Sequence, residues 1–143
     1  MKIFLDTNIL MDVLLARQPF CIHSARVLEL CAEGQLDGHV STIAFPTLAY
    51  VLRKGHTAEY VRQKLNLLTN IVMPVDFTGI LLKQAMLLPF DDLEDVMQYT
   101  CAMSCGAEAI VTRNIKDYTD SRIPSFVPEN FLAMFNDLRK ELP

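Results

Sequence analysis

Glycine and proline are scarce in this sequence, with five glycines and seven prolines scattered among 143 residues. No Gly-, Ser- or Pro-rich stretch, low-complexity segment or internal repeat marks a linker between separate units. A chain of this length suits one domain, which buries roughly two-thirds of its unfolded surface without a disulfide or metal staple. We therefore predict a single domain that spans residues 1–143.

Long apolar runs are also absent, since none reaches the ~20 residues that a membrane-spanning helix needs. An acidic residue, Asp6, follows the first apolar run too early for a signal peptide. Both absences favour a cytoplasmic protein that makes no use of a membrane. Hydrophobic residues nonetheless make up 51% of the chain, which indicates an α/β core or a face covered in an oligomer or complex.

The sequence has no Cys-x-x-Cys pair, and none of its four cysteines has a histidine nearby at zinc-finger spacing. We expect buried free thiols rather than a zinc site. The three histidines are isolated, and we expect them on the surface or in loops. These residues are Cys21, Cys31, Cys101, Cys105, His23, His39 and His56.

The chain lacks an excess of positive charge, because its net charge is −4 and its pI is about 5.3. This balance argues against a protein that grips nucleic acid by bulk charge. It does not exclude a nuclease, since cations bound to clustered acids offset their charge locally.

Short apolar runs alternate with stretches of helical periodicity along the whole chain. We predict strands at residues 3–5, 39–42, 71–75, 109–112 and 125–127, with helices between them. We expect Thr57 to cap one helix, Asp76 to open the next, and Pro89 to end it. The alternation predicts an α/β fold with a mostly parallel sheet of about five strands and helices on both faces, a three-layer αβα sandwich. In such sheets the reactive residues gather beyond the carboxyl ends of the strands.

Acidic residues occur at three places beside these strand ends or helix starts. Asp6 follows the first strand, and Asp117 follows the fourth. Segment 91–95 holds the third group, in which Asp92 and Asp95 share a face because they are three residues apart. Taken singly, these acids have ordinary explanations as a helix cap, first-turn residues favoured by the helix dipole, and a turn residue.

Taken together, the same acids would converge on one edge of the sheet. Close like charges cost energy unless a cation neutralises them. Carboxylate and amide oxygens are hard ligands that suit Mg²⁺ or Mn²⁺. Such ions can activate water and stabilise the transition state of phosphodiester hydrolysis.

Three motifs make the sequence resemble PIN domains. Residues 5–10 (LDTNIL) are similar to their opening motif, and residues 92–95 (DLED) to their central acidic motif at the start of a long helix. Residues 112–118 (TRNIKDY) are similar to their Thr-Arg-Asn/Asp-x-x-Asp-aromatic motif. The order and spacing match over nearly the whole chain. The resemblance implies a PIN-like fold and a metal-dependent ribonuclease acting on RNA, often as a dimer, and in many members the toxin of a toxin–antitoxin pair.

The resemblance also implies roles for individual residues, with Mg²⁺ or Mn²⁺ as the cofactor. Three carboxylates match the metal-holding positions, and the helix-start neighbour and one asparagine match assisting catalytic positions. Two further polar residues match supporting positions around the metal. In that order the residues are Asp6, Asp95 and Asp117, then Asp92 and Asn114, then Asn8 and Thr112.

The sequence departs from the family pattern in the helix after the second strand, where a glutamate is usual. Thr47 occupies the matching position. A threonine supplies no carboxylate charge, although its hydroxyl can hold a metal-bound water. Glu59 lies on a different predicted helix. The departure keeps open a second hypothesis, a degenerate PIN domain that binds RNA or a protein without cutting.

A third hypothesis is phosphoryl transfer through an aspartyl-phosphate at Asp6. It is weakened because Asn8 stands where a second aspartate would be expected. We expect Asp12 to point away from the acidic site and Arg113 to be a solvated charge. The partners implied are an RNA substrate, a protein antitoxin and a second copy of the chain in a homodimer.

Overall fold

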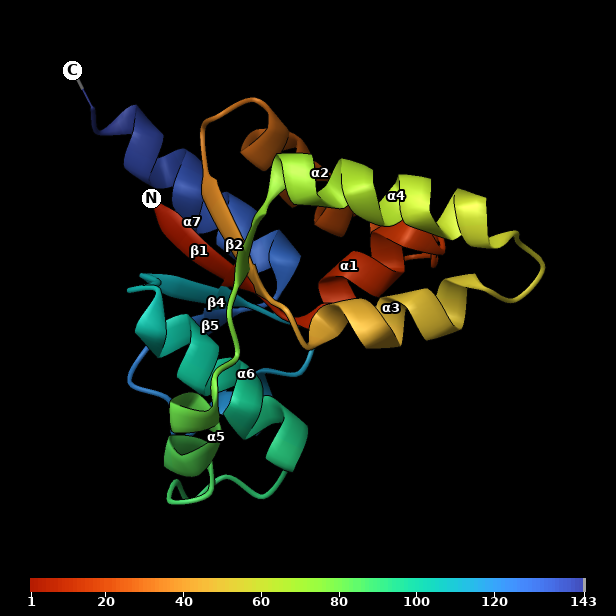
Figure 1. Cartoon of the computed structure of the whole chain (residues 1–143). Helices are drawn as coiled ribbons and strands as arrows, with labels where there is room; N and C mark the ends of the chain where they lie inside the picture. The colour runs from red at the N-terminus through yellow and green to blue at the C-terminus, as the bar shows by residue number, and fades with distance from the viewer. Residues whose placement is uncertain (143) are drawn as a thin grey trace.

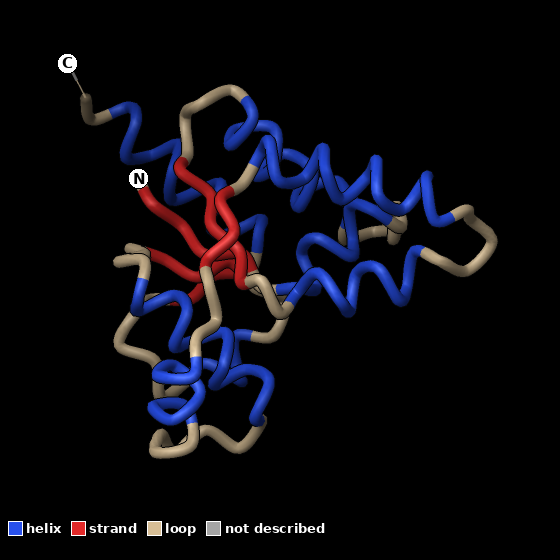
Figure 2. Tube along the Cα trace, in the orientation of Figure 1, coloured by secondary structure: helices blue, strands red, loops and turns tan. Residues whose placement is uncertain are grey.

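The computed structural model describes residues 1–142 and contains a five-stranded parallel sheet. The strands lie in the order β3-β2-β1-β4-β5 and every neighbouring pair is parallel. They are β1 (Lys2–Leu5), β2 (Asp37–Ser41), β3 (Met73–Val75), β4 (Ala109–Val111) and β5 (Ser125–Phe126). Figure 2 shows them in red at the centre of the molecule, surrounded by helices. The predicted fold class is therefore confirmed.

Helices connect the strands and cover both faces of the sheet (Figure 1). They are α1 (Thr7–Leu14), α2 (Cys21–Ala32), α3 (Ala44–Leu52), α4 (Ala58–Ile71), α5 (Gly79–Ala85), α6 (Leu93–Ser104), the 3₁₀ helix η1 (Ile115–Tyr118) and α7 (Pro128–Lys140). Within residues 1–142, no helix combines the length and the apolar character needed to cross a bilayer.

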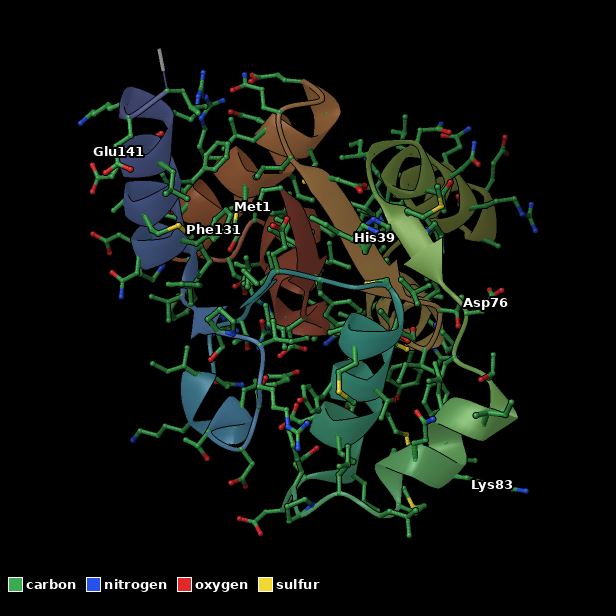
Figure 3. The ribbon with its side chains drawn as sticks, turned by 90° about the vertical axis from the view of Figure 1, so that its left-hand side faces the viewer. Met1, His39, Asp76, Lys83, Phe131 and Glu141 are labelled. Carbon is green, nitrogen blue, oxygen red and sulfur yellow. The ribbon has the colours of Figure 1, made fainter. Side chains whose placement is uncertain are left out.

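Alternating side chains of the central strand divide the core into two layers. Ile3 and Leu5 pack in a cluster with residues of α1, α2, α3, α4 and α7. Phe4 lies between them in sequence and packs on the opposite face with residues of α5 and α6. Phe131 of α7 is fully buried in the first layer, and Figure 3 shows it beside β1. A strand with both faces covered reads as a continuous apolar run, which explains the sequence of β1.

Several predicted boundaries hold and others are wrong. Thr57 caps α4, because its Oγ1 accepts a hydrogen bond from the Tyr60 amide at 3.1 Å. Asp76 does not open the next helix: it lies in the β3–α5 connection (Figure 3), and Thr78 caps α5 instead. The predicted third strand is shorter than expected because Ile71 is still part of α4. The helix expected to end at Pro89 ends at Ala85.

The four cysteines are free thiols, as predicted, but only Cys31 and Cys101 are buried, while Cys21 and Cys105 are partly exposed. His39 corrects the expectation of a surface or loop histidine. It lies in the middle of β2 and is only 9% exposed, and its Nε2 is 2.9 Å from Asp37 Oδ1.

Candidate active site

The order of the strands creates one place where polar side chains gather. The chain runs outward from β1 to β2 and β3 and then returns to place β4 on the other side of β1. In doubly wound sheets a crevice opens at the carboxyl ends of the two strands where the order reverses. Asp6 directly follows β1 and Thr112 directly follows β4. These two residues therefore stand at the two sides of that crevice.

A hollow of about 280 Å³ lies at this point. Residues from the end of β1, α1, α3, the start of α6 and the segment around η1 line it. They are Asp6, Thr7, Asn8, Met11, Thr47, Asp92, Glu94, Asp95, Asn114 and Asp117. Among these lining residues there are five carboxylates and no lysine, arginine or histidine. We refer to this feature as the acidic hollow.

Asp6 is held by side chains from several parts of the chain and is only 5% exposed. Its Oδ2 accepts hydrogen bonds from Thr112 Oγ1 at 2.8 Å, Tyr118 OH at 3.3 Å and Asn8 Nδ2 at 3.4 Å. Asp6 occupies the N-cap position of α1, yet its side chain makes no capping bond. The ordinary explanation of Asp6 as a helix cap therefore fails for its carboxylate.

Burial raises the pKa of Asp6, and the nearby charge of Glu94 acts in the same direction. The hydrogen bonds from Thr112, the Thr7 backbone and Tyr118 oppose this shift in the Asp6 pKa. Burial also raises the pKa of Tyr118, so its hydroxyl stays protonated and donates to Asp6. The carboxylate is thus poorly solvated but well oriented.

The segments that follow β1 and β4 are joined by a short chain of hydrogen bonds. Asn8 donates to Asp6, and its Oδ1 accepts from the Arg113 amide at 3.4 Å. Thr112 donates to Asp6 and accepts from the Asn114 amide at 3.0 Å through the same Oγ1. The first and third sequence motifs therefore meet at Asp6.

The start of α6 supplies the acids of segment 91–95. Asp92 caps this helix, with Oδ1 accepting a hydrogen bond from the Asp95 amide at 3.0 Å. Burial, followed by the charges of Asp6, Asp92 and Asp117, raises the pKa of Asp95 to about 7. Neighbouring carboxylates raise one another's pKa when no cation lies between them. No cationic side chain lines the hollow, so its negative charges are not offset.

Packing between helices holds the base of the hollow. Gln98 on α6 is 1% exposed, and its Nε2 donates to Thr7 Oγ1 on α1 at 2.8 Å. This bond ties the helix that carries Asp95 to the helix that follows Asp6. A buried hydrogen bond between two elements fixes their relative position because leaving either partner unpaired would cost about 1–3 kcal/mol.

Some of the remaining candidate residues line the acidic hollow and others do not. Asn114, Asp117 and Thr47 all line the acidic hollow, so the position of the usual family glutamate does face the acids. Glu59, in the first turn of α4, does not line it. Glu94 lines the hollow and was missed as a site residue, although it belongs to the DLED motif.

The part of the chain that the structure describes contains no three His, Cys, Asp or Glu side chains arranged to hold a metal ion together. The donor chemistry of the acidic hollow nevertheless fits a hard divalent cation. Its carboxylates are oxygen donors, and after burial the charges of Asp6, Asp92 and Asp117 contribute to the raised pKa of Asp95. A bound cation would remove that repulsion.

Arg113 lies outside the acidic hollow and has a different partner. Its Nε is 2.7 Å from Asp12 Oδ2, and Asp12 is fully buried. Neither Asp12 oxygen has a partner in hydrogen-bonding geometry, so the contact is chiefly electrostatic. The expectation of a solvated Arg113 is therefore wrong, because the guanidinium also stacks 4.1 Å over the Phe20 ring. Burial raises the pKa of Asp12, while Arg113 and Arg17 oppose that shift.

Comparisons with known proteins agree with this fold. Ribonuclease VapC1 of Aquifex aeolicus is 25% identical over 142 residues, which cover 96% of this chain and 97% of that protein. The VapBC2 structure from Rickettsia felis, bound to a DNA fragment from the promoter, has a TM-score of 0.62 at 22% identity. It covers 89% of this chain and 98% of that chain.

A toxin–antitoxin complex from Klebsiella pneumoniae has a TM-score of 0.65 at 20% identity, covering 87% of this chain and 96% of that chain. These two structures establish the likeness of the fold. The family model described as PIN domain matches residues 2–116. This stretch contains Asp6, the segment at the start of α6 and Asn114, and it confirms the resemblance seen in the motifs. The chain belongs to the PIN domain family.

Proposed function

We propose that this protein is a ribonuclease that uses Mg²⁺ or Mn²⁺ to hydrolyse RNA phosphodiester bonds. The observation that carries the proposal is the acidic hollow, which lies at the switch point of the sheet in a PIN-domain chain. The curated relative from Aquifex aeolicus is named as a ribonuclease and matches nearly the full length of both proteins.

The residues of the hollow differ in their proposed roles, which are to hold the cation or to position its ligands. Asp6, Asp95 and Asp117 would hold the cation, with Asp92 and Asn114 beside them. When bound, the cation supplies an activated water and stabilises negative charge on the phosphate. Thr112 and Tyr118 keep the Asp6 carboxylate in one orientation through their hydrogen bonds. Asp92 fixes the first turn of α6 and thereby the position of Asp95.

A catalytically weakened PIN domain that only binds RNA or protein is the second candidate. Thr47 favours it, because a neutral hydroxyl lines the hollow where a further carboxylate is usual in the family. The two candidates differ in one respect that can be measured, namely whether purified protein cuts RNA when the metal is added.

The partners remain proposals of the same kind. The similar structure from Klebsiella pneumoniae is a toxin–antitoxin complex. We infer that this protein is likewise a toxin, held inactive by a protein antitoxin, and that it forms a homodimer. Light scattering of the purified protein tests the dimer. A second protein that co-purifies with this chain and inhibits its cleavage of RNA would support the antitoxin.

The first prediction concerns cleavage of a labelled RNA with and without Mn²⁺. Replacing Asp6→Asn keeps the shape but removes the charge, so cleavage should fall at least about 100-fold, since metal catalysis contributes several kcal/mol. Thr47→Glu should strengthen Mn²⁺ binding, measured by calorimetry. The matched control is Asp76→Asn, an exposed aspartate in the β3–α5 connection, which should cleave like wild type.

Two outcomes would count against the nuclease. Cleavage that persists at full rate in Asp6→Asn protein would show that the activity does not arise from this hollow. Mn²⁺ binding without cleavage of any RNA, even in Thr47→Glu protein, would favour the binding module.

A further inference from the structure

The antiparallel pair α3 and α4 projects away from the sheet, and the loop that joins them lies at the far right of Figure 1. Figure 2 shows the same loop at the outer edge of the molecule. We call residues 50–64, which contain the end of α3, this loop and the first half of α4, the hairpin tip. None of the hairpin tip lines the acidic hollow.

The hairpin tip carries a concentration of positive charge that the rest of the chain lacks. Four of the thirteen lysine and arginine residues lie in segment 53–64, against one acid, Glu59. This segment therefore has a net charge of +3 in a chain whose net charge is −4. Arg53 and Lys54 are exposed and make no ion pair with an acid in the structure of residues 1–142.

Aromatic rings alternate with these cations. The Arg53 guanidinium lies 4.2 Å over the ring of Tyr50, which is 65% exposed. The His56 and Tyr60 rings stack with centroids 4.1 Å apart, and Lys64 Nζ lies 5.4 Å from the Tyr60 centroid. Burial in the core does not explain an exposed tyrosine on a helix end. Proteins that bind single-stranded nucleic acid combine cationic side chains, which contact phosphates, with aromatic rings, on which bases stack.

The hairpin tip also has a surface shape and a position that suit an RNA strand. A hollow of about 550 Å³ lies against Tyr50, Val51, Arg53 and Lys54. Thr47, on the same helix, lines the acidic hollow. Arg53, the C-cap of α3, is six residues further along, which is roughly 9 Å at 1.5 Å per residue. An RNA strand of a few nucleotides could span this distance.

We propose that the hairpin tip binds the single-stranded RNA that flanks the cleavage site, with Arg53 and Lys54 on phosphates and Tyr50 stacked on a base. This inference rests on the proposed ribonuclease function. It explains how an acidic protein holds a polyanion: the flanking strand lies on a basic surface that is separate from the five carboxylates of the acidic hollow. An acidic protein partner would use the charges but has no need of the exposed ring.

The binding experiment uses Asp6→Asn protein, in which cleavage of the probe should be strongly reduced, and a fluorescein-labelled 12-nucleotide single-stranded RNA. Anisotropy should show about tenfold weaker binding when Arg53→Ala and Lys54→Ala are introduced. The slope of log affinity against log salt should fall by about 1.4, since each lost phosphate contact on a single strand removes roughly 0.7. Tyr50→Ala should also weaken binding about tenfold, and Tyr50→Phe should retain it.

The matched control is the double variant Arg139→Ala and Lys140→Ala, which removes an exposed Arg–Lys pair from the last turn of α7. Arg139 also lies over an aromatic ring, Phe135, at 5.7 Å. Affinity and salt slope should be unchanged in this control. Equal losses in both double variants, or none in either, would overturn the proposal. The proposal would also be overturned if the Arg53→Ala and Lys54→Ala variant bound RNA normally but no longer bound a poly-glutamate peptide.

Cleavage kinetics in the active protein separate this inference from the function on which it rests. With Arg53→Ala and Lys54→Ala, the KM for a 12-nucleotide RNA should rise about tenfold, while a 4-nucleotide RNA should be cut as by wild type. Unchanged KM for both substrates would defeat the role of the hairpin tip but leave the nuclease standing. No cleavage by wild type, together with RNA binding that still depends on Arg53 and Lys54, would defeat the nuclease alone.

Discussion

At the scale of single residues, one buried carboxylate lies outside the acidic hollow. Asp12 is fully buried on α1, and its nearest cation is Arg113, directly after the residue that binds Asp6. Arg17 is more distant, at 4.0 Å. Because Arg113 follows Thr112, this ion pair also helps to hold the segment after β4 against α1. Its role is to position the third motif.

Removing Arg113 should therefore destabilise the fold strongly. Arg113→Ala leaves a buried carboxylate without its close partner, and the free energy of unfolding in urea should fall by about 3 kcal/mol. Arg26→Ala is the control, since Arg26 pairs with Glu29 and Glu33 at the surface and should cost less than about 1 kcal/mol. Combining Arg113→Met with Asp12→Leu should recover most of the loss, because the buried charge is gone. Equal effects of the two arginine variants would contradict this account.

At the scale of elements, close packing of α2 on β2 depends on a glycine in the strand. A Cβ at Gly38 would lie 2.6 Å from Cys31 Sγ and 3.1 Å from Val72 Cγ1. The buried thiol thus fills the space above the strand, which accounts for Cys31 without any metal or redox role. Burial raises the pKa of the Cys31 thiol to about 12, so it stays protonated.

Gly38→Ala should lower the free energy of unfolding by about 1–3 kcal/mol, because the added methyl group overpacks this contact. Cys31→Ala in the same chain removes the sulfur that the methyl group meets. The double variant should therefore lose about 1 kcal/mol less than the sum of the two single variants. Gly79→Ala is the matched control, since nothing lies within 4 Å of its added Cβ. Additive losses would show that Cys31 is not the obstacle.

At the scale of the whole molecule, the acidic hollow links the stability of the fold to pH. Burial and the neighbouring carboxylates raise the pKa of Asp95 to about 7, whereas an aspartate in an unfolded chain has a pKa near ~3.9. Between these values the folded protein binds more protons than the unfolded chain. The free energy of unfolding contributed by Asp95 therefore falls as pH rises from about 4 to about 7.

Asp95→Asn removes this dependence. In EDTA, the variant should gain on the order of 1–2 kcal/mol relative to wild type between pH 4 and pH 8, after allowance for the partial exposure of Asp95. Urea unfolding at both pH values measures the difference. Asp137→Asn, an exposed aspartate on α7, should show none. A constant difference between Asp95→Asn and wild type at the two pH values would refute the linkage.

The sequence by itself determined the order of elements and the places where acids follow strands. Runs such as Ile3–Leu5 and Ala109–Val111 are apolar because both faces of their strands are covered, and that pattern is local. Helix ends were harder to place, since Asp76 and Thr78 both have capping side chains and only the position of β3 decided between them. The three motifs were visible because each is contiguous in the chain.

Only the tertiary structure decided which side chains meet. Tyr118 reaches Asp6 across 112 residues, and Arg113 reaches the buried Asp12 across the same switch point. No spacing rule connects such positions, because their distance depends on how α1, α6 and η1 pack on the sheet. The same holds for the hairpin tip, whose charges look ordinary in the sequence. They form one surface because α3 and α4 pack side by side and project away from the sheet.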